Sequence, residues 1–386
     1  MEDKKRSYQT WGFWLCLLVM FAVTFAMTKV EIGKEYTDFR THSRWAVGEK
    51  LEPRFNKFYF YPVWHFCVRF VNWLLPIGRE YAAAFVTACF LGVTGALLYH
   101  LLWKELGKRW KIQQCVLLAL SLLFVTALYM PWYNPQVYLG QSSPTIWHNP
   151  TNMAVKPVAL LIFLVFMKLY RERETIGNGW IALESGLLLF SCFIKPSFLQ
   201  GFLPAMVLFL LMELIPNRGK SFGFSLKLAL MCVPSGIYFI VQYLAMFDST
   251  ESRIIEVSPF EVIGLDAPSP VFSILLAVAF PLFVLVALGA KQIFRDKALW
   301  MAVLFYLCSL LEFVMLVERP EVSAGNFEWA LQLALFLLFV MTAIRFYQTE
   351  WKQKWIRTAG NLLLLYHTLS GIWYYIDLLL ISGWQC

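Results

Sequence analysis

The segment that follows the first apolar stretch of the chain carries residues that could do chemistry. In YTDFRTHSRWA, Asp38 and His42 lie four residues apart, one turn of a helix, just beyond the end of that stretch. A carboxylate beside an imidazole can accept a proton from an incoming hydroxyl group, which predicts a general base. The same pair, with Glu31 or Glu35 as a third ligand, could instead hold a divalent metal. A third interpretation is an ordinary pair on a wet interfacial helix.

A second polar segment, residues 131–152, contains further candidate site residues. Its prolines, glycine and asparagines predict turns rather than helix. If this segment folds back over the first one, His148 would take part in catalysis by orienting the substrates, and Asn149 would bind one of them. Turn capping by the Asn-Pro sequence is the alternative.

Three cations are expected at the outer ends of helices: Lys156, Lys195 and Arg319. Lys195 interrupts an apolar stretch, and an ammonium group beside the exposed amides that follow Pro196 would suit a phosphate. Asn326 lies in the same outer turn as Arg319 and is another candidate substrate ligand. Alternatively, the cations only extend toward the membrane surface, and Arg319 pairs with neighbouring glutamates.

Other residues and motifs narrow the chemistry. Glu312 lies inside a predicted membrane helix, so its carboxyl group should face a polar cavity or a partner, or be protonated. His65 is assigned to an aromatic cluster, and His100 and His367 to packing. The chain contains no Walker lysine loop, dinucleotide fingerprint, Cys/His zinc spacing or Gly-x-Ser-x-Gly elbow. Any reaction should therefore use a substrate that is reached from the outer leaflet.

The composition predicts the class of protein that must position these residues. The chain is 59% hydrophobic and only 15% charged, which is far from the balance of a soluble domain. We predict an all-α, polytopic membrane protein, one domain over residues 1–386, because apolar runs of spanning length recur throughout. About eleven helices are expected, at residues 11–30, 81–103, 113–130, 153–170, 179–194, 199–215, 223–246, 269–290, 299–317, 327–345 and 359–381. The two helices around residues 195–198 could form one broken element.

The distribution of basic residues predicts the topology. Lys and Arg concentrate at the N-terminus and in alternate short turns, which the positive-inside rule places in the cytoplasm. We therefore expect a cell-membrane protein with a cytoplasmic N-terminus and an extracytoplasmic C-terminus. Residues 31–80 and 131–152 become the first and second extracytoplasmic loops. The first apolar stretch has no small-residue cleavage site after it, so a retained helix is expected rather than a signal peptide.

The first outer loop should contain interfacial helices. Residues 36–50 indicate a surface helix, and residues 58–76 indicate an aromatic interfacial or re-entrant helix. The alternative, a twelfth span at residues 58–76, would invert everything downstream. Six of the eight cysteines fall within predicted spans, which leaves Cys67 and Cys386 as the only pair that could meet outside.

This outline resembles the GT-C superfamily of polytopic membrane glycosyltransferases. The similarity lies in about ten or more spans, a long first outer loop with surface helices and an acidic residue shortly after the first span, here Asp38 in YTDFRTHSRWA. The resemblance implies a sugar donor on a polyprenyl phosphate carrier, a catalytic base at Asp38, and a lipid phosphate near Lys156 and Lys195. The segments WHNPTNMAVKP and GNFEWA also resemble membrane proteins of bacterial envelope clusters. An Asp-x-Asp motif and a large soluble C-terminal domain are lacking, so neither metal nor acceptor is carried over.

We therefore expect transfer of a sugar from a polyprenyl-phosphate-linked donor to an envelope glycan, lipid or protein acceptor at the extracytoplasmic face. Asp38 would deprotonate the acceptor hydroxyl while cations hold the phosphate leaving group, and His42 and His148 would orient the substrates. The alternatives are an envelope polysaccharide polymerase or ligase, and a transporter or lipid flippase. Membrane lipids are further partners. No nucleic acid is expected, because the positive-inside bias and affinity for anionic headgroups account for most of the +8 net charge.

Overall fold

The computed structural model describes residues 2–34, 37–49, 58–215, 218–246 and 254–380. These residues are mostly helical, with one pair of short strands, which confirms the all-α class. The first half contains α1 (Glu2–Gly33), α2 (Asp38–Ala46), α3 (Val63–Leu74), α4 (Arg79–Leu106), α5 (Ile112–Phe124), α6 (Pro150–Arg171), α7 (Asn178–Ile194) and α8 (Ser197–Leu214). The second half contains α9 (Phe222–Met231), α10 (Val233–Met246), β1 (Ile254–Val257), α11 (Glu261–Gly264), α12 (Pro270–Ala277), α13 (Ala279–Leu288), α14 (Ala290–Arg295), α15 (Lys297–Met315), β2 (Leu316–Arg319), η3 (Val322–Ala324), α16 (Glu328–Gln348) and α17 (Lys354–Leu380). Glu35 and Cys386 lie outside the described residues.

Several helices have the length and composition of membrane spans. Within the described part of the chain, seven qualify: α1 from Thr10, α4, α6, α8, α15, α17 and α16 together with η3. The number rises to nine if the bent pairs α9–α10 and α12–α13, with bends of 43° and 71°, each form one span. Two shorter apolar helices, α5 and α7, coincide with two further predicted spans. These helices indicate a multi-pass membrane protein.

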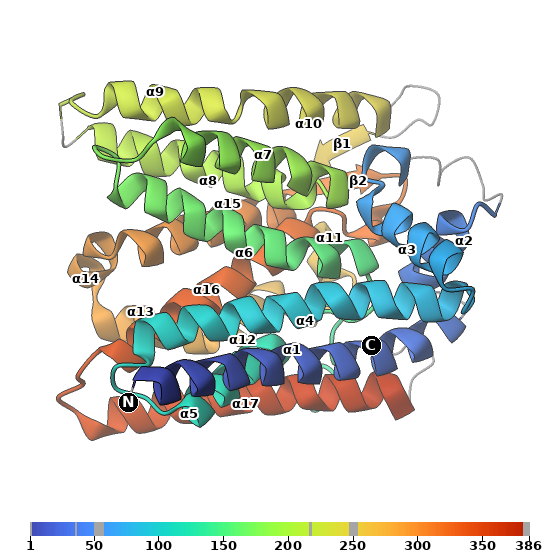
Figure 1. Ribbon diagram of the computed structural model, residues 1–386, viewed down its shortest axis with the longest axis horizontal. Helices are drawn as coiled ribbons and strands as arrows, with labels where there is room; N and C mark the ends of the chain where they lie inside the picture. The colour runs from blue at the N-terminus through green and yellow to red at the C-terminus, as the bar shows by residue number, and fades with distance from the viewer. Residues whose placement is uncertain (1, 35–36, 50–57, 216–217, 247–253, 381–386) are drawn as a thin grey trace.

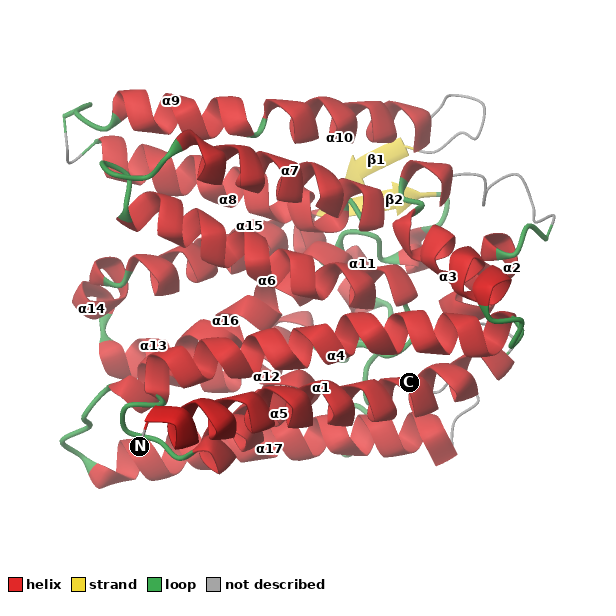
Figure 2. Cartoon of the chain, in the orientation of Figure 1, coloured by secondary structure: helices red, strands yellow, loops and turns green. Residues whose placement is uncertain are grey.

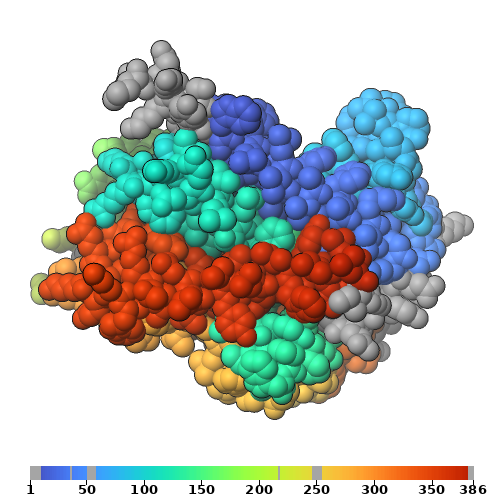
Figure 3. Space-filling view, turned by 90° about the horizontal axis from the view of Figure 1, so that it is seen from below, coloured from blue at the N-terminus to red at the C-terminus, as the bar shows by residue number. Residues whose placement is uncertain are grey.

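The long helices run side by side, and α2, α3 and the two strands lie together at one end of the bundle (Figure 1). α2, α3, β1 and β2 lie at the right of the view, at the opposite end from α14 (Figure 2). The two strands pair antiparallel, with Ile254 opposite Arg319 and Val257 opposite Leu316. Seen from below, the orange-red α17 crosses the bundle between the blue α1 and a green segment that follows α5 (Figure 3). The end with α2 and the strands therefore collects segments from distant parts of the sequence.

Burial separates central helices from peripheral ones. α16 is buried over almost its whole length from Ala330 to Phe346, and α6 is similarly enclosed. Helices that are apolar on every side belong in the centre of a bundle. In contrast, α10 exposes Ile237, Ile240 and Leu244. These exposed side chains suit contact with lipid, because soluble proteins rarely leave such continuous apolar surface uncovered.

The predicted helix over residues 113–130 is too long, because α5 ends at Phe124. The chain beyond it is held by neighbouring helices rather than by its own: the Thr126 N–H donates to the His367 carbonyl at 3.3 Å. α17 can approach so closely because it has glycine at the crossing point. A Cβ atom on Gly371 would lie 1.3 Å from the Phe124 carbonyl oxygen. An apolar sequence alone does not show whether a segment is a helix or an extended segment that is buried among other helices.

The helix predicted over residues 153–170 begins earlier, directly after Asn149. The Asn149 Oδ1 atom accepts the Asn152 N–H at 2.9 Å, which is N-capping geometry. Lys156 and Pro157 therefore lie in the second turn of α6. In contrast, α7 and α8 are separate helices with Lys195 between them, which agrees with the predicted break.

Candidate functional site

A cavity of about 730 Å³ lies at the end of the bundle that carries α2 and the strands. The residues around α2 and before α3, the connection from α5 to α6, the α7–α8 junction, α10, α11, α15 and the segment from β2 to α16 contribute to its wall. Six of the predicted site residues line it: Asp38, His42, His148, Asn149, Lys195 and Asn326. Lys156 and Arg319 are not part of this lining. The structure thus brings together most, but not all, of the residues selected from the sequence.

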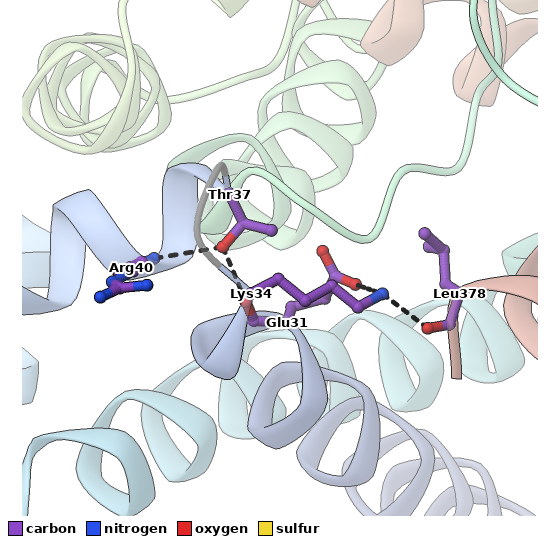
Figure 4. A network of polar contacts seen from close by, with 5 residues as sticks. All are labelled: Glu31, Lys34, Thr37, Arg40 and Leu378. Atoms are coloured by element: carbon purple, nitrogen blue, oxygen red, sulfur yellow. Dashed lines mark hydrogen bonds and ion pairs between the residues drawn. The ribbon is translucent and has the colours of Figure 1, made fainter. Parts of the chain in front are cut away.

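Asp38 is the first residue of α2, and a polar network at the end of α1 sets its position (Figure 4). Thr37 is the N-cap of α2, and its hydroxyl donates to the Glu31 carbonyl at 2.7 Å. Lys34 Nζ donates to Glu31 Oε1 at 2.7 Å and to the Leu378 carbonyl at 2.6 Å. The network connects the start of α2 to the ends of α1 and α17, so the position of Asp38 is fixed by contacts with both helices.

The Asn149 side chain connects Asp38 to Lys195. Its Nδ2 donates to Asp38 Oδ2 at 2.6 Å, and its Oδ1 accepts from Lys195 Nζ at 3.1 Å. Lys195 Nζ also donates to Thr151 Oγ1 at 3.3 Å and lies 4.4 Å from the centre of the Trp329 ring. A single amide therefore holds the predicted base and the predicted phosphate-binding cation in one chain of hydrogen bonds.

The charge on Lys195 is sensitive to what occupies the cavity. Burial lowers the pKa of the Lys195 ammonium to about 7, and the Asp38 carboxylate opposes this effect. Burial also lowers the pKa of His148; Asp38 opposes that change and Lys195 adds to it. The His148 ring packs against Tyr138 and Trp329, with ring centres 5.0 and 5.8 Å away. An anion beside Lys195 would favour its charged form.

His42 is bonded to another histidine rather than to Asp38. Its Nδ1 lies 2.7 Å from His65 Nε2, and both rings stack on Phe58. Burial is the main reason that the pKa of His42 lies well below its ordinary value and that of His65 falls to about 3. Two neutral rings share one N–H between them. His65 lies in the aromatic cluster expected from the sequence, but its contact with a cavity residue was not foreseen.

The remaining cations have other partners. Lys156 is buried and donates to the Pro144 carbonyl at 2.9 Å, so it holds the connection between α5 and α6 against α6. Arg319 forms ion pairs with Glu261 at 2.8 Å and Glu256 at 3.0 Å, which belong to α11 and β1 and not to the turn of Arg319 itself, where glutamate partners were expected. Asn326 donates to Glu318 Oε2 at 2.6 Å at the edge of the cavity. Neither Lys156 nor Arg319 is placed where a ligand in the cavity would touch it.

A buried hydrogen-bond network, which was not predicted from the sequence, supports the wall of the cavity at Tyr138. Gln332 Nε2 donates to the Tyr138 hydroxyl at 2.8 Å, and Gln332 Oε1 accepts from Asn152 Nδ2 at 2.9 Å. The signal was a glutamine inside the otherwise apolar helix of GNFEWALQ, since a buried amide in a membrane helix needs a partner. The network joins α16 to the second outer loop and the start of α6.

No metal centre is formed by the described side chains. Within that part of the chain, no three His, Cys, Asp or Glu residues are placed to hold a metal ion. Glu35, one of the suggested third ligands for Asp38 and His42, is outside it. Compared with known proteins, the chain matches no protein-family model and no curated protein sequence. The geometry of the cavity therefore carries the functional argument.

Proposed function

We propose that this protein is a membrane glycosyltransferase that moves a sugar from a polyprenyl-phosphate-linked donor to an envelope acceptor at the extracytoplasmic face. The observation that carries the proposal is the chain Asp38–Asn149–Lys195 on the wall of one large cavity. Group transfer from a phosphate carrier needs a base for the acceptor and a cation for the leaving group. The chain supplies both within one hydrogen-bonded unit.

In the proposed reaction, Asp38 removes the proton of the acceptor hydroxyl. The acceptor oxygen attacks the anomeric carbon, the bond from that carbon to the phosphate oxygen breaks, and the phosphate leaves with the bonding electron pair. The Asn149 amide occupies only Asp38 Oδ2, and Oδ1 accepts no hydrogen bond from the described residues. Oδ1 is therefore available to the acceptor. His42 and His148, neutral beside it, orient the substrates.

The phosphate would lie at the start of α8. Lys195 directly precedes this 18-residue helix, whose N-cap residue Pro196 provides no side-chain hydrogen bond. Free N–H groups at a helix start attract anions. Ser197 adds a hydroxyl that is buried and without a hydrogen-bond partner among the described residues. Lys195, Pro196 and Ser197 all line the cavity.

The wall of the same cavity also has apolar parts suited to a lipid chain. Phe239 and Tyr243 of α10, Ile263 of α11, and Phe313 and Leu316 at the end of α15 belong to its lining. A polyprenyl chain needs such apolar contacts, whereas a free nucleotide sugar does not. Glu312, in the last turn of α15, lines this cavity too rather than a separate site deeper in the bundle, which favours an enzyme over a transporter.

The topology of the proposal counts both bent pairs and both short apolar helices as spans, which gives eleven, with interfacial helices in the first loop. The cavity then faces outward. Cysteine labelling of intact cells with an impermeant reagent tests this arrangement. Gly107→Cys, in a basic turn after α4, should stay unlabelled until the membrane is permeabilised; labelling before that step would invert the topology.

The activity itself is tested in proteoliposomes that contain the purified protein, a radiolabelled polyprenyl-phosphate sugar and envelope extracts as acceptors. A labelled product that forms only with protein supports the proposal. Export of a solute or movement of the intact donor across the bilayer, without any transfer product, would contradict it and favour a transporter or flippase.

A further inference from the structure

One part of the cavity wall is built around Asp266, which follows α11. Asn134 Nδ2 donates to the Asp266 carbonyl at 3.2 Å, and a Cβ atom on Gly140 would lie 2.5 Å from the Asp266 carbonyl carbon. Gly140 also has a φ of +71°, so both its conformation and its close approach require glycine. This contact brings Gln141 and Ser142, the next two residues, to the same region of the cavity wall.

Gln141 and Ser142 present buried oxygen atoms that lack partners. The two side chains are 1% and 4% exposed, and neither Gln141 Oε1 nor Ser142 Oγ has a hydrogen bond within the described residues. Ser142 also adopts a φ of +54°, which is unusual for a residue with a side chain. Buried polar groups are normally hydrogen-bonded. These oxygens therefore indicate a ligand that supplies the missing donors.

Two carboxylates share this region. Asp266 and Glu328, at the start of α16, both line the cavity, and their like charges act on each other. Neither carboxylate forms an ion pair with another described residue, and Glu328 accepts a hydrogen bond from the Gln332 side chain. Gln332, one turn after Glu328, donates to the Tyr138 hydroxyl at 2.8 Å, and Tyr138 lines the same cavity as Asp38, the proposed base. A cation bound between the two carboxylates would offset their like charge.

The balance of charge over the whole cavity also favours a positively charged ligand. Seven carboxyl side chains line it, against the ammonium groups of Lys34 and Lys195. Lys34 is paired with Glu31, and Lys195 is the cation assigned to the donor phosphate. An acceptor that carried a carboxylate or phosphate here would meet like charge. A donor-rich, positively charged group would meet complementary charge and unoccupied hydrogen-bond acceptors.

We infer that Asp266, Glu328, Gln141 and Ser142 bind a primary ammonium group on the acceptor. This inference rests on the proposed function, because it names the acceptor class of that same cavity. Three N–H donors of an ammonium match the carboxylate, amide and hydroxyl oxygens of the wall. The group could belong to an amino sugar or to an ethanolamine headgroup, which share this chemistry. Binding there would hold a neighbouring hydroxyl for Asp38.

A binding experiment without any donor tests this inference. The purified protein in phosphatidylcholine nanodiscs is titrated with glucosamine and with ethanolamine, and with N-acetylglucosamine and N-acetylethanolamine as neutral counterparts. We expect at least one amine to bind about tenfold or more tightly than its acetylated form, as for a charge-assisted hydrogen bond. Preference for glucosamine identifies a sugar as the source of the ammonium, and preference for ethanolamine identifies a headgroup.

The variants locate the site. The double variant Asp266→Asn, Glu328→Gln should lose most of the preference for the amine, whereas the matched control Glu174→Gln, in an exposed turn, should keep it. Equal binding of amine and acetylated forms to the wild-type protein would overturn the inference without any variant. So would binding that requires a divalent ion and is abolished by EDTA, because the carboxylates would then be metal ligands. Transfer to a neutral acceptor with no amine preference would overturn the inference alone and leave the proposed function standing.

Discussion

Asn149 and Asp38 are 111 residues apart in the sequence and joined by a 2.6 Å hydrogen bond between side chains. The bond connects the N-terminal residue of α2 to the N-cap of α6, so two helix starts meet at the cavity. Because Asn149 also accepts from Lys195, its position governs both ends of the proposed chemistry. Loss of this bond should therefore affect both the proposed base and the proposed phosphate-binding cation.

Replacing Asn149 should separate its two roles. Asn149→Ser keeps an N-cap but cannot span the distance from Asp38 to Lys195, so transfer should slow by about 10- to 100-fold through misplacement. Asn149→Ala loses the cap as well, and its free energy of unfolding should fall by a further ~0.5–2 kcal/mol. Transfer assays and thermal unfolding of the purified variants measure both. Wild-type turnover in Asn149→Ser would remove the bridge from the mechanism.

Lys195→Ala should weaken binding of polyprenyl phosphate. Loss of a charged hydrogen bond costs ~1.5–3 kcal/mol, or about 10- to 150-fold in affinity. Since the pKa of Lys195 is lowered to about 7, the wild-type affinity should also fall as pH rises through 7, where the ammonium deprotonates. Lys108→Ala is the matched control, because Lys108 is exposed in the turn after α4 and does not line the cavity. A pH-independent affinity, unchanged in Lys195→Ala, would place the phosphate elsewhere.

The histidine pair should make the fold sensitive to acid. The pKa of His65 is about 3 in the folded protein and ~6.5 when unfolded. Between these values the unfolded chain binds a proton that the folded protein does not, so stability decreases as pH falls from 6.5 toward 3. At pH 5 the share of His65 is about 2 kcal/mol, and the lowered pKa of His42 acts in the same direction. Thermal unfolding at pH 7.5 and at pH 5 measures this loss of stability. The loss between the two pH values should be smaller in His65→Gln than in the wild-type protein. An equal loss in both proteins would show that His65 is not its source.

Gly371 should be intolerant of any side chain. Its Cβ would overlap the Phe124 carbonyl, so Gly371→Ala must move α17 away from the end of α5 and lose ~1–3 kcal/mol of stability. Gly236 in α10 has nothing within 4 Å of its Cβ position, and Gly236→Ala should be neutral or slightly stabilising. The melting temperatures of the two variants test this prediction. Similar values would show that α17 does not contact the end of α5 at Gly371.

The helices were largely predictable because membrane-length apolar runs have few alternatives. Their ends were not. The run beyond Phe124 is as apolar as a helix yet is held by the backbone of α17, a tertiary contact that hydropathy does not encode. Lys156-Pro157 and Lys195-Pro196 look alike in sequence, but the Asn149 cap starts α6 early and buries Lys156, while Lys195 falls at a true break.

The site was predictable in part for the same reason. Asp38, His148 and Asn149 could be selected by residue type and by their place in outer loops. Which of them touch could not, because loop folding depends on contacts far apart in the chain. The His42–His65 contact is an example: the i, i+4 spacing favoured Asp38 as the partner of His42, whereas packing on Phe58 brought in His65 instead.

Whether Asp38 is the general base is tested most directly by the rate of sugar transfer by Asp38→Asn in proteoliposomes with a polyprenyl-linked donor. Asparagine keeps the size of the side chain but is not a base, so the account predicts a rate ~10²- to 10⁴-fold lower, with donor binding and thermal unfolding close to wild type. Glu174→Gln, a matched loss of one carboxylate, should transfer normally. Near-normal transfer by folded Asp38→Asn would contradict the role of Asp38 as the general base.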